Sequence, residues 1–236
     1  DIANVNADLS VYKANGNKFP ASYKLLGFPI STFSSTPLRA GDLYFKDLNG
    51  DNIITDADKS IIGNAYPKFS YGFAMNMNYK IVDLSASFNG TQGNTVLDGQ
   101  DYYVRNMEGS GNLYTIVKQR YRNDANPGNG KEYRASRGGS QSNSTRLSDY
   151  YLQDGSFFRC TNISLNVNLS SLSIFKKMKI GGITWSASVD NAFTITEYFG
   201  YNPEVDFNNG SNLTPGVDYG KYPLVRSFNT GFKVQF

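Results

Sequence analysis

The sequence predicts an all-β protein whose strands form part of a transmembrane antiparallel β-barrel. Three observations support this prediction. Five segments alternate apolar and polar residues, their polar faces carry small uncharged side chains, and short connections between segments alternate with long ones. Aromatic residues make up 14% of the chain and charged residues only 18%, a composition that favours strands and loops over helices.

The five segments repeat apolar and polar residues with a period of two, the spacing at which side chains of a strand point to opposite faces. The length of each segment is close to the roughly 9–11 residues that a tilted strand needs to cross a bilayer. The segments cover residues 69–80, 82–89, 162–169, 183–190 and 228–236. In the first of them, one face carries Phe69, Tyr71, Phe73, Met75, Met77 and Tyr79.

The polar faces of these segments consist mostly of Ser, Asn, Thr and Gly. A soluble sandwich usually carries Lys, Glu and Arg on its wet face, whereas small neutral groups suit a crowded aqueous lumen. The apolar faces mix aliphatic residues with aromatic residues near the strand ends, as a lipid-facing band with interfacial girdles does. The pattern favours a lipid-facing barrel, with a soluble β-sandwich as the alternative.

The connections predict which strand ends face the periplasm. The first two segments join near Lys80 and Ile81, and the third and fourth join through residues 170–179. About 60 residues separate the second segment from the third, and about 30 separate the fourth from the fifth. Outer-membrane barrels have short periplasmic turns and long extracellular loops. Five strands cannot close a barrel without exposing backbone groups to lipid, so we expect the other strands outside this chain.

The chain is therefore divided into an upstream segment, residues 1–67, and five barrel strands with two long extracellular loops, residues 68–236. Residues 113–121 have helical spacing and predict a short helix in the first of these loops. Loop tyrosines either stack on sugar rings or serve in loop packing or an interfacial girdle, and the sequence alone assigns no ligand-binding residue. These tyrosines are Tyr102, Tyr103, Tyr198, Tyr201 and Tyr219.

Composition excludes several functions. The net charge of +3 comes without a basic run, which argues against nucleic-acid binding. The chain has no His, and its single Cys160 has no partner for a disulfide or a metal site, so catalysis that depends on these groups is excluded. Glu204 and Asp206 form a carboxylate pair beside Pro203, which we interpret as a solvated loop. We expect no enzymatic activity.

Residues 47–58 have the spacing of a calcium-binding loop. Oxygen donors fall at the ligand positions of such a loop, with the main-chain carbonyl of Ile53 at the seventh. Asn52 replaces the usual Gly at the sixth position, where Asn can adopt the left-handed conformation that the turn needs. Asp58 replaces the usual Glu at the twelfth position. The predicted structural Ca²⁺ ligands are Asp47, Asn49, Asp51, Ile53, Thr55 and Asp58. The alternative is an Asx-rich turn without metal.

Several stretches, in chain order, share their pattern with one known family. They are residues 41–51 (GDLYFKDLNGD), 67–73 (PKFSYGF), 154–159 (DGSFFR), 190–196 (DNAFTIT), 198–205 (YFGYNPEV) and 222–223 (YP). Together they resemble hallmark stretches of the SusC/RagA family of TonB-linked outer-membrane transporters. The resemblance implies the C-terminal strands of a roughly 22-stranded barrel in membrane lipid.

The resemblance also implies a function. Such proteins lie in the bacterial outer membrane, pair with a SusD-like surface lipoprotein, and import glycans or peptides with energy from the TonB complex. The plug domain and the TonB-interacting regions are expected upstream of this chain. The competing hypotheses are a soluble calcium-stabilised β-sandwich carbohydrate-binding module and a non-transporting barrel such as a porin or adhesin.

Overall fold

The computed structural model describes residues 2–16, 30–31, 39–136, 143–144, 146–177, 181–207 and 213–235. The described part is mostly strand and loop, with few helical residues. The chain divides into two compact units. We call Asp1–Ile62 with Gln100–Tyr151 the loop unit, and Gly63–Gly99 with Leu152–Phe236 the sheet unit.

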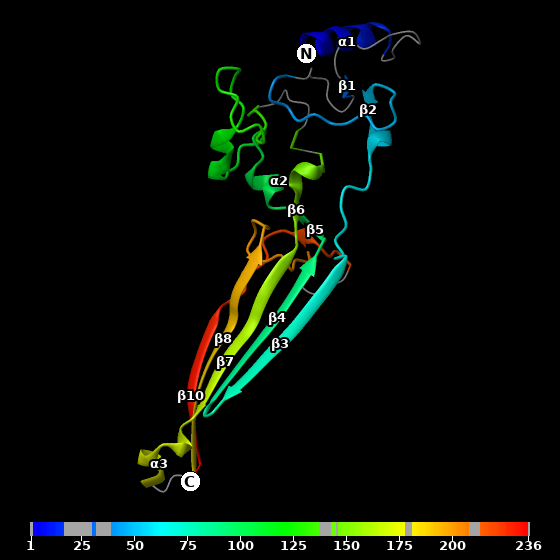
Figure 1. Cartoon of the computed structure of the whole chain (residues 1–236). Coiled ribbons are helices and arrows are strands. Elements are labelled where there is room, and N and C mark those ends of the chain that lie inside the picture. Colours follow the sequence, from blue (N-terminus) through cyan, green and yellow to red (C-terminus); the bar gives the residue numbers. More distant parts are fainter. Residues whose placement is uncertain are drawn as a thin grey trace. The chain divides into compact units, whose positions relative to one another are not determined.

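The sheet unit contains an antiparallel sheet of five long strands (Figure 1). The strands pair in the order β10-β8-β7-β4-β3. Every segment in which the sequence alternates has formed one of these strands, so the five predicted strands are confirmed. Only Phe236, at the end of the last predicted segment, lies outside the described residues. The strands are β3 (Phe69–Tyr79), β4 (Val82–Gln92), β7 (Phe157–Asn168), β8 (Gly182–Thr196) and β10 (Ser227–Gln235).

The register of the sheet brings like residues side by side across all five strands. Because side chains alternate along each strand, one row of paired residues faces one side and the next row faces the other. The sheet therefore has one apolar face and one polar face. An apolar row runs through Met75, Ala86, Ile163, Val189 and Phe228, and the adjacent polar row runs through Asn76, Ser85, Ser164, Ser188 and Asn229.

A β-bulge in β7 keeps this division of the faces intact. The register with β4 shifts between Ser87 and Phe88, and Thr161 is the extra residue on β7. The Thr161 hydroxyl donates to the main-chain oxygen of Ser87 at 3.0 Å. A one-residue insertion reverses the parity of side chains beyond it, so Phe158 and Cys160 lie on the apolar face. The alternation read from the sequence stops at this bulge.

The two hairpins of the sheet have different turns. Lys80, in the left-handed conformation with φ of +56°, joins β3 to β4 directly through Ile81. The connection from β7 to β8 contains a 3-10 turn, η4 (Leu169–Ser171), and a short helix, α3 (Ser173–Lys177). The two short turns predicted from the sequence are thus present.

A second, small sheet completes the sheet unit. Its strands are β6 (Leu152–Asp154), β5 (Thr95–Asp98) and β9 (Val217–Asp218), with β5 antiparallel to β6 and parallel to β9. Val96, Tyr198 and Val205 form its buried core. The sequence did not predict this sheet, because its short strands pair residues that are far apart in the chain.

The loop unit consists of short elements around a small core. Met107, Val117 and Tyr133 are buried together, and Leu43 and Tyr150 pack against them. The helix predicted for residues 113–121 forms as a short 3-10 helix, η2 (Thr115–Gln119), rather than an α-helix. No helix among the described residues is long and apolar enough to span a membrane. The elements are α1 (Ile2–Ala14), β1 (Ile30–Ser31), β2 (Ile53–Ile54), η1 (Asp56–Asp58), α2 (Asp101–Val104), η2 (Thr115–Gln119) and η3 (Asp149–Tyr151).

Candidate functional site

The apolar face of the five-stranded sheet is exposed over much of its area in the described chain. Met75 in the middle of β3 is 43% exposed, and Phe228 and Phe232 on β10 are 74% and 68% exposed. An apolar surface of this extent on a protein marks an interaction with another apolar phase or partner. The face is therefore a candidate functional surface.

Aromatic rings form a band across four strands of this face. Phe73 stacks on Phe88 with ring centres 4.7 Å apart, and Phe88 stacks on Phe158 at 5.6 Å. Phe158 in turn contacts Phe193 at 6.2 Å. A transverse band of aromatic rings on an apolar strand surface is the arrangement that barrels place at a membrane interface.

The polar face of the sheet is held together by cross-strand hydrogen bonds between short side chains. The hydroxyls of Ser85 and Ser164 lie 2.6 Å apart. Asp190 accepts a hydrogen bond from the amide of Asn162 at 2.7 Å and another from the amide of Asn229 at 3.1 Å. The carboxylate of Asp190 therefore accepts hydrogen bonds from neutral amides on the two neighbouring strands. Such a surface suits water or polar ligands without carrying a strong net field.

The residues predicted as calcium ligands form a compact turn in the loop unit. Asp47 accepts hydrogen bonds at 2.7 Å from the main-chain nitrogens of Gly50 and Asn52. Asn52 has a φ of +68°, the left-handed conformation that the sixth position of a calcium loop requires. Asn49 and Asp51 each accept a bond from the nitrogen two residues later, at 2.9 and 2.8 Å.

Asp58 closes this turn. Its carboxylate accepts main-chain bonds from Leu48 at 2.9 Å and Thr55 at 2.7 Å. Hydrogen bonds from the Thr55 and Leu48 nitrogens hold the pKa of Asp58 below its usual value. Among the described residues, no group of three or more acidic, His or Cys side chains is gathered as a metal site. The carboxylate, amide and hydroxyl oxygens of this turn are the kinds of ligand that calcium prefers. In this structure the carboxylates accept hydrogen bonds from main-chain nitrogens of the turn.

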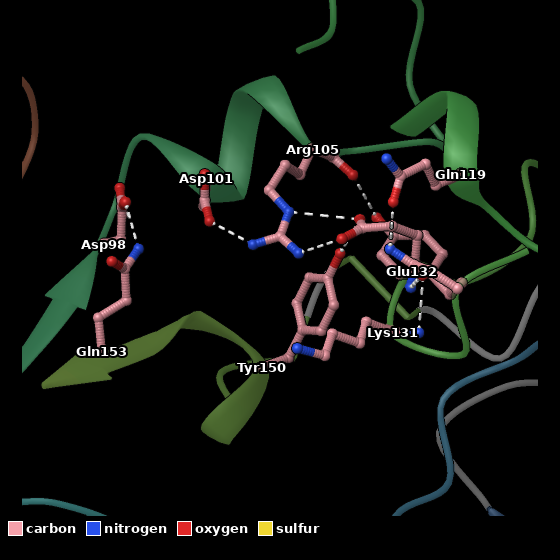
Figure 2. A network of polar contacts seen from close by, with 10 residues as sticks. Asp98, Asp101, Arg105, Gln119, Lys131, Glu132, Tyr150 and Gln153 are labelled. Carbon is pink, nitrogen blue, oxygen red and sulfur yellow. Dashed lines mark hydrogen bonds and ion pairs between the residues drawn. The ribbon is translucent and has the colours of Figure 1, made fainter. Parts of the chain in front are cut away.

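The loop unit also contains a buried ionic network that the sequence analysis did not predict (Figure 2). The Arg105 guanidinium donates to Asp101 at 2.6 Å and to Glu132 at 2.5 Å. Tyr150 donates to Glu132 at 2.8 Å, and Arg105 lies 4.5 Å from the centre of the Tyr150 ring. The side chains of Asp101 and Glu132 are 3% and 2% exposed. The spacing of Asp101 and Arg105, four residues apart, was the one local signal for this network.

Burial shifts the pKa values of two residues in and beside this network. It raises the pKa of the Asp101 carboxyl despite the neighbouring Arg105. Burial also raises the pKa of Tyr133 to about 12. The Tyr133 hydroxyl donates to the main-chain oxygen of Arg105 at 3.0 Å and accepts from the Met107 nitrogen at 3.2 Å. Tyr133 thereby ties the ionic network to the apolar core of the loop unit.

The carboxylate pair considered for catalysis is engaged in ion pairs. Glu204 pairs with Arg159, which also donates to Asn202 at 3.0 Å. Asp206 pairs with Lys221 at 2.8 Å. The two carboxyl groups of a glycosidase flank the scissile bond and face each other across it, whereas these two carboxylates pair with different cations and join segments of the sheet unit.

The loop tyrosines divide between packing and exposure. Tyr198 is 5% exposed and donates to Asp218, so it belongs to the small core of the sheet unit. Tyr102 packs against Tyr151, with ring centres 5.9 Å apart. Tyr103, Tyr201 and Tyr219 have exposed rings. Tyr103 and Tyr219 also make ring contacts, with Tyr102 at 5.3 Å and with Phe207 at 5.1 Å. Packing contacts therefore involve four of the five tyrosines, and sugar stacking by the exposed rings stays a prediction.

Comparisons with known proteins agree with this architecture. No protein-family model matches the chain. The chain is 30% identical to the TonB-dependent receptor P39 of Formosa agariphila over 233 residues, which are 98% of this chain and 22% of that receptor. It is also 30% identical to the TonB-dependent receptor SusC of Bacteroides thetaiotaomicron over 193 residues, which are 81% of this chain and 17% of SusC.

Solved structures show the same fold. A structure of the RagAB peptide transporter matches with a TM-score of 0.62 and 21% identity, over 78% of this chain and 19% of that one. The RagAB peptide importer in its closed-closed state matches with a TM-score of 0.60. The chain spans about a fifth of the length of the relatives that it matches.

The two-faced antiparallel sheet and these similarities define a segment of the TonB-dependent receptor class. Within that class the chain is a SusC/RagA-like segment, as the hallmark stretches predicted.

Proposed function

We propose that this chain forms barrel strands and loops of an outer-membrane TonB-dependent transporter that imports nutrients. The observation that carries the proposal is the register of the five-stranded sheet, which separates an apolar face from a polar face over every strand. Lipid contacts the apolar face, and the aqueous lumen lies against the polar face. Residues 68–236 then supply the barrel strands and two extracellular loops, as the sequence analysis expected.

Strand length supports a membrane position. The 11 residues of β3 and of β4 extend about 36 Å at roughly 3.3 Å per residue. Tilted by about 40°, they cover about 28 Å along the membrane normal, close to the apolar band of roughly 25 Å in outer-membrane barrels. The sheet therefore reaches from one membrane interface to the other.

The proposed cargo and partners follow from the relatives. The relatives include SusC and the RagAB peptide importer, and we propose glycans or peptides as cargo and a SusD-like lipoprotein as the partner. TonB would act on parts of the receptor outside this chain. No catalytic step is part of this proposal.

Fractionation of the cells that make this protein tests the proposal. The species that contains the chain is expected in the outer-membrane fraction, extractable only with detergent, with a mass several-fold above the chain's 26.1 kDa. Purification through an affinity tag should recover a surface lipoprotein with it. A soluble, folded species of about 26.1 kDa would overturn the proposal and favour the soluble calcium-stabilised module.

We further propose that the turn at residues 47–58 binds a structural Ca²⁺. The left-handed Asn52 and the bonds from main-chain nitrogens to Asp47 support this proposal. A carboxylate has about four lone-pair directions, and three are used at Asp58 by Leu48, Asn49 and Thr55. One direction is left, so Asp58 would bind the ion through a single oxygen, and a weak site is expected.

Calcium is expected to protect this turn against protease cleavage in the full-length receptor, with half-protection at about 0.1–1 mM, the range of extracellular calcium modules. Asp47→Ala should abolish the protection, because it removes the first ligand position. Asp56→Ala is the matched control: Asp56 is an exposed acidic residue at the tenth position, paired with Lys59. Cleavage at the same rate in calcium and in EDTA would show that the turn binds no calcium.

A further inference from the structure

The loop unit contains a depression of about 390 Å³ that the proposed function does not use. Such a volume falls within the roughly 300–1,000 Å³ of small-ligand sites. Met107 and Val117, which are buried, form its apolar base, and Leu113 and Ala135 add to the wall. These residues come from η2 and from the two segments that flank it.

Arg120 is the one charged residue among the described residues that line this depression. Among the residues that line it, only Arg120 and Ser136 have polar side chains. Arg120 is half-buried and makes one long bond, from Nη1 to the main-chain oxygen of Val117 at 3.4 Å. Within the part of the chain that is described, it forms no ion pair with a carboxylate, unlike Arg105, Arg134 and Arg159. Its guanidinium therefore has donors available for an anion.

The rest of the loop unit holds this depression in shape. The Ser136 nitrogen donates a hydrogen bond to the main-chain oxygen of Met107 at 3.0 Å. This bond joins two segments that line the depression. The Met107 nitrogen donates to Tyr133, which in turn bonds the main chain of Arg105 in the buried ionic network. A site supported in this way loses little freedom when a ligand binds.

The lining selects the chemical class of the ligand. A sugar presents many hydroxyls, and a depression with two polar side chains and no aromatic ring would leave most of them unpaired when buried. A planar guanidinium matches a carboxylate, to which it can donate two parallel bonds. The depression therefore fits an aliphatic group that carries a carboxylate beside it. The last residue of a peptide, with an apolar side chain, has this arrangement.

We propose that this depression binds the C-terminal residue of an oligopeptide with an aliphatic last side chain, and that Arg120 pairs with the terminal carboxylate. The proposal rests on the proposed import function and specifies peptide as its cargo.

Peptide binding to the full-length receptor, purified in detergent with its lipoprotein partner, tests this inference by calorimetry. The probes are Ala-Ala-Leu with a free carboxylate, its C-terminal amide, and a trimer of galacturonic acid. The free acid is expected to bind roughly tenfold or more tightly than the amide, as a charge-assisted bidentate pair predicts. The galacturonate trimer, an anion without an aliphatic group, should bind no better than the amide.

Two substitutions at Arg120 test whether the preference for the free acid arises in the depression. Arg120→Gln should remove the preference for the free acid, and Arg120→Lys should keep part of it. Arg122→Gln is the matched control, because Arg122 is exposed and lies outside the lining. Equal binding of acid and amide, or equal effects of Arg120→Gln and Arg122→Gln, would overturn the inference. If no probe binds to a receptor that is found in the outer membrane, the inference is overturned as well. That result does not contradict the proposed transport function.

Discussion

Met75→Arg is expected to destabilise the membrane-inserted receptor by about 2–4 kcal/mol, the cost of a cationic side chain at the bilayer midplane of a barrel. Met75 lies at the middle of β3 on the apolar face and is 43% exposed. A half-exposed methionine in contact with water would accept arginine with a change of only about 0.5 kcal/mol. The substitution therefore distinguishes a lipid-facing surface from a wet one.

Two neighbouring positions on the same strand provide controls. Asn76→Arg places the same charge on the polar face, where an aqueous lumen accepts it, and a change of under about 1 kcal/mol is expected. Tyr79 lies on the apolar face at the end of β3 and is 70% exposed. Tyr79→Arg is therefore expected to cost only about 0–1 kcal/mol, because charges are tolerated near the membrane interface. Denaturant unfolding of the receptor in lipid vesicles measures all three values. Equal costs at Met75 and Asn76 would exclude a lipid-facing apolar surface.

The strands were predictable because their signal is local. Each alternation between Phe69 and Tyr79, for example, lies within one strand, so the sequence predicts both the element and its two faces. The prediction stopped at Thr161 because a bulge reverses the parity, and no local pattern announces which residue bulges. Residues 113–121 had helical spacing, but only Thr115–Gln119 formed a turn of helix, because Met107 and Tyr133 from other segments fix how Val117 packs.

The interactions between distant residues were not predictable. The small sheet pairs Leu97 with Val217, which are 120 residues apart. The local sequence around these two residues contains nothing that specifies their pairing. The Arg105–Glu132 ion pair joins residues 27 apart, and it lies beside the ring contact of Tyr133 with Tyr150, which is also non-local. The calcium loop is intermediate: the positive φ of Asn52 followed from its position in the motif, whereas ion binding stays a prediction.

Arg105→Met is expected to lower the local stability of the loop unit by about 3–5 kcal/mol, because it leaves the carboxylates of Asp101 and Glu132 buried without their cation. None of these residues belongs to the five-stranded sheet, so strand pairing should be unaffected. Hydrogen exchange of the amides in residues 101–136 of the full-length receptor measures the loss, and the amides of β4 and β7 serve as the internal reference.

Removing all three charges tests the cause of this loss. The triple variant Arg105→Met, Asp101→Asn and Glu132→Gln has no unpaired charge, and replacing a whole buried ionic group by neutral residues is often close to neutral. It should therefore exchange more slowly than Arg105→Met alone. Lys118→Met, at an exposed position of η2, controls for the added methionine. If Arg105→Met exchanges no faster than Lys118→Met, the ionic network contributes nothing to the order of the loop unit. The loop would then depend on its apolar core of Met107, Val117 and Tyr133 alone.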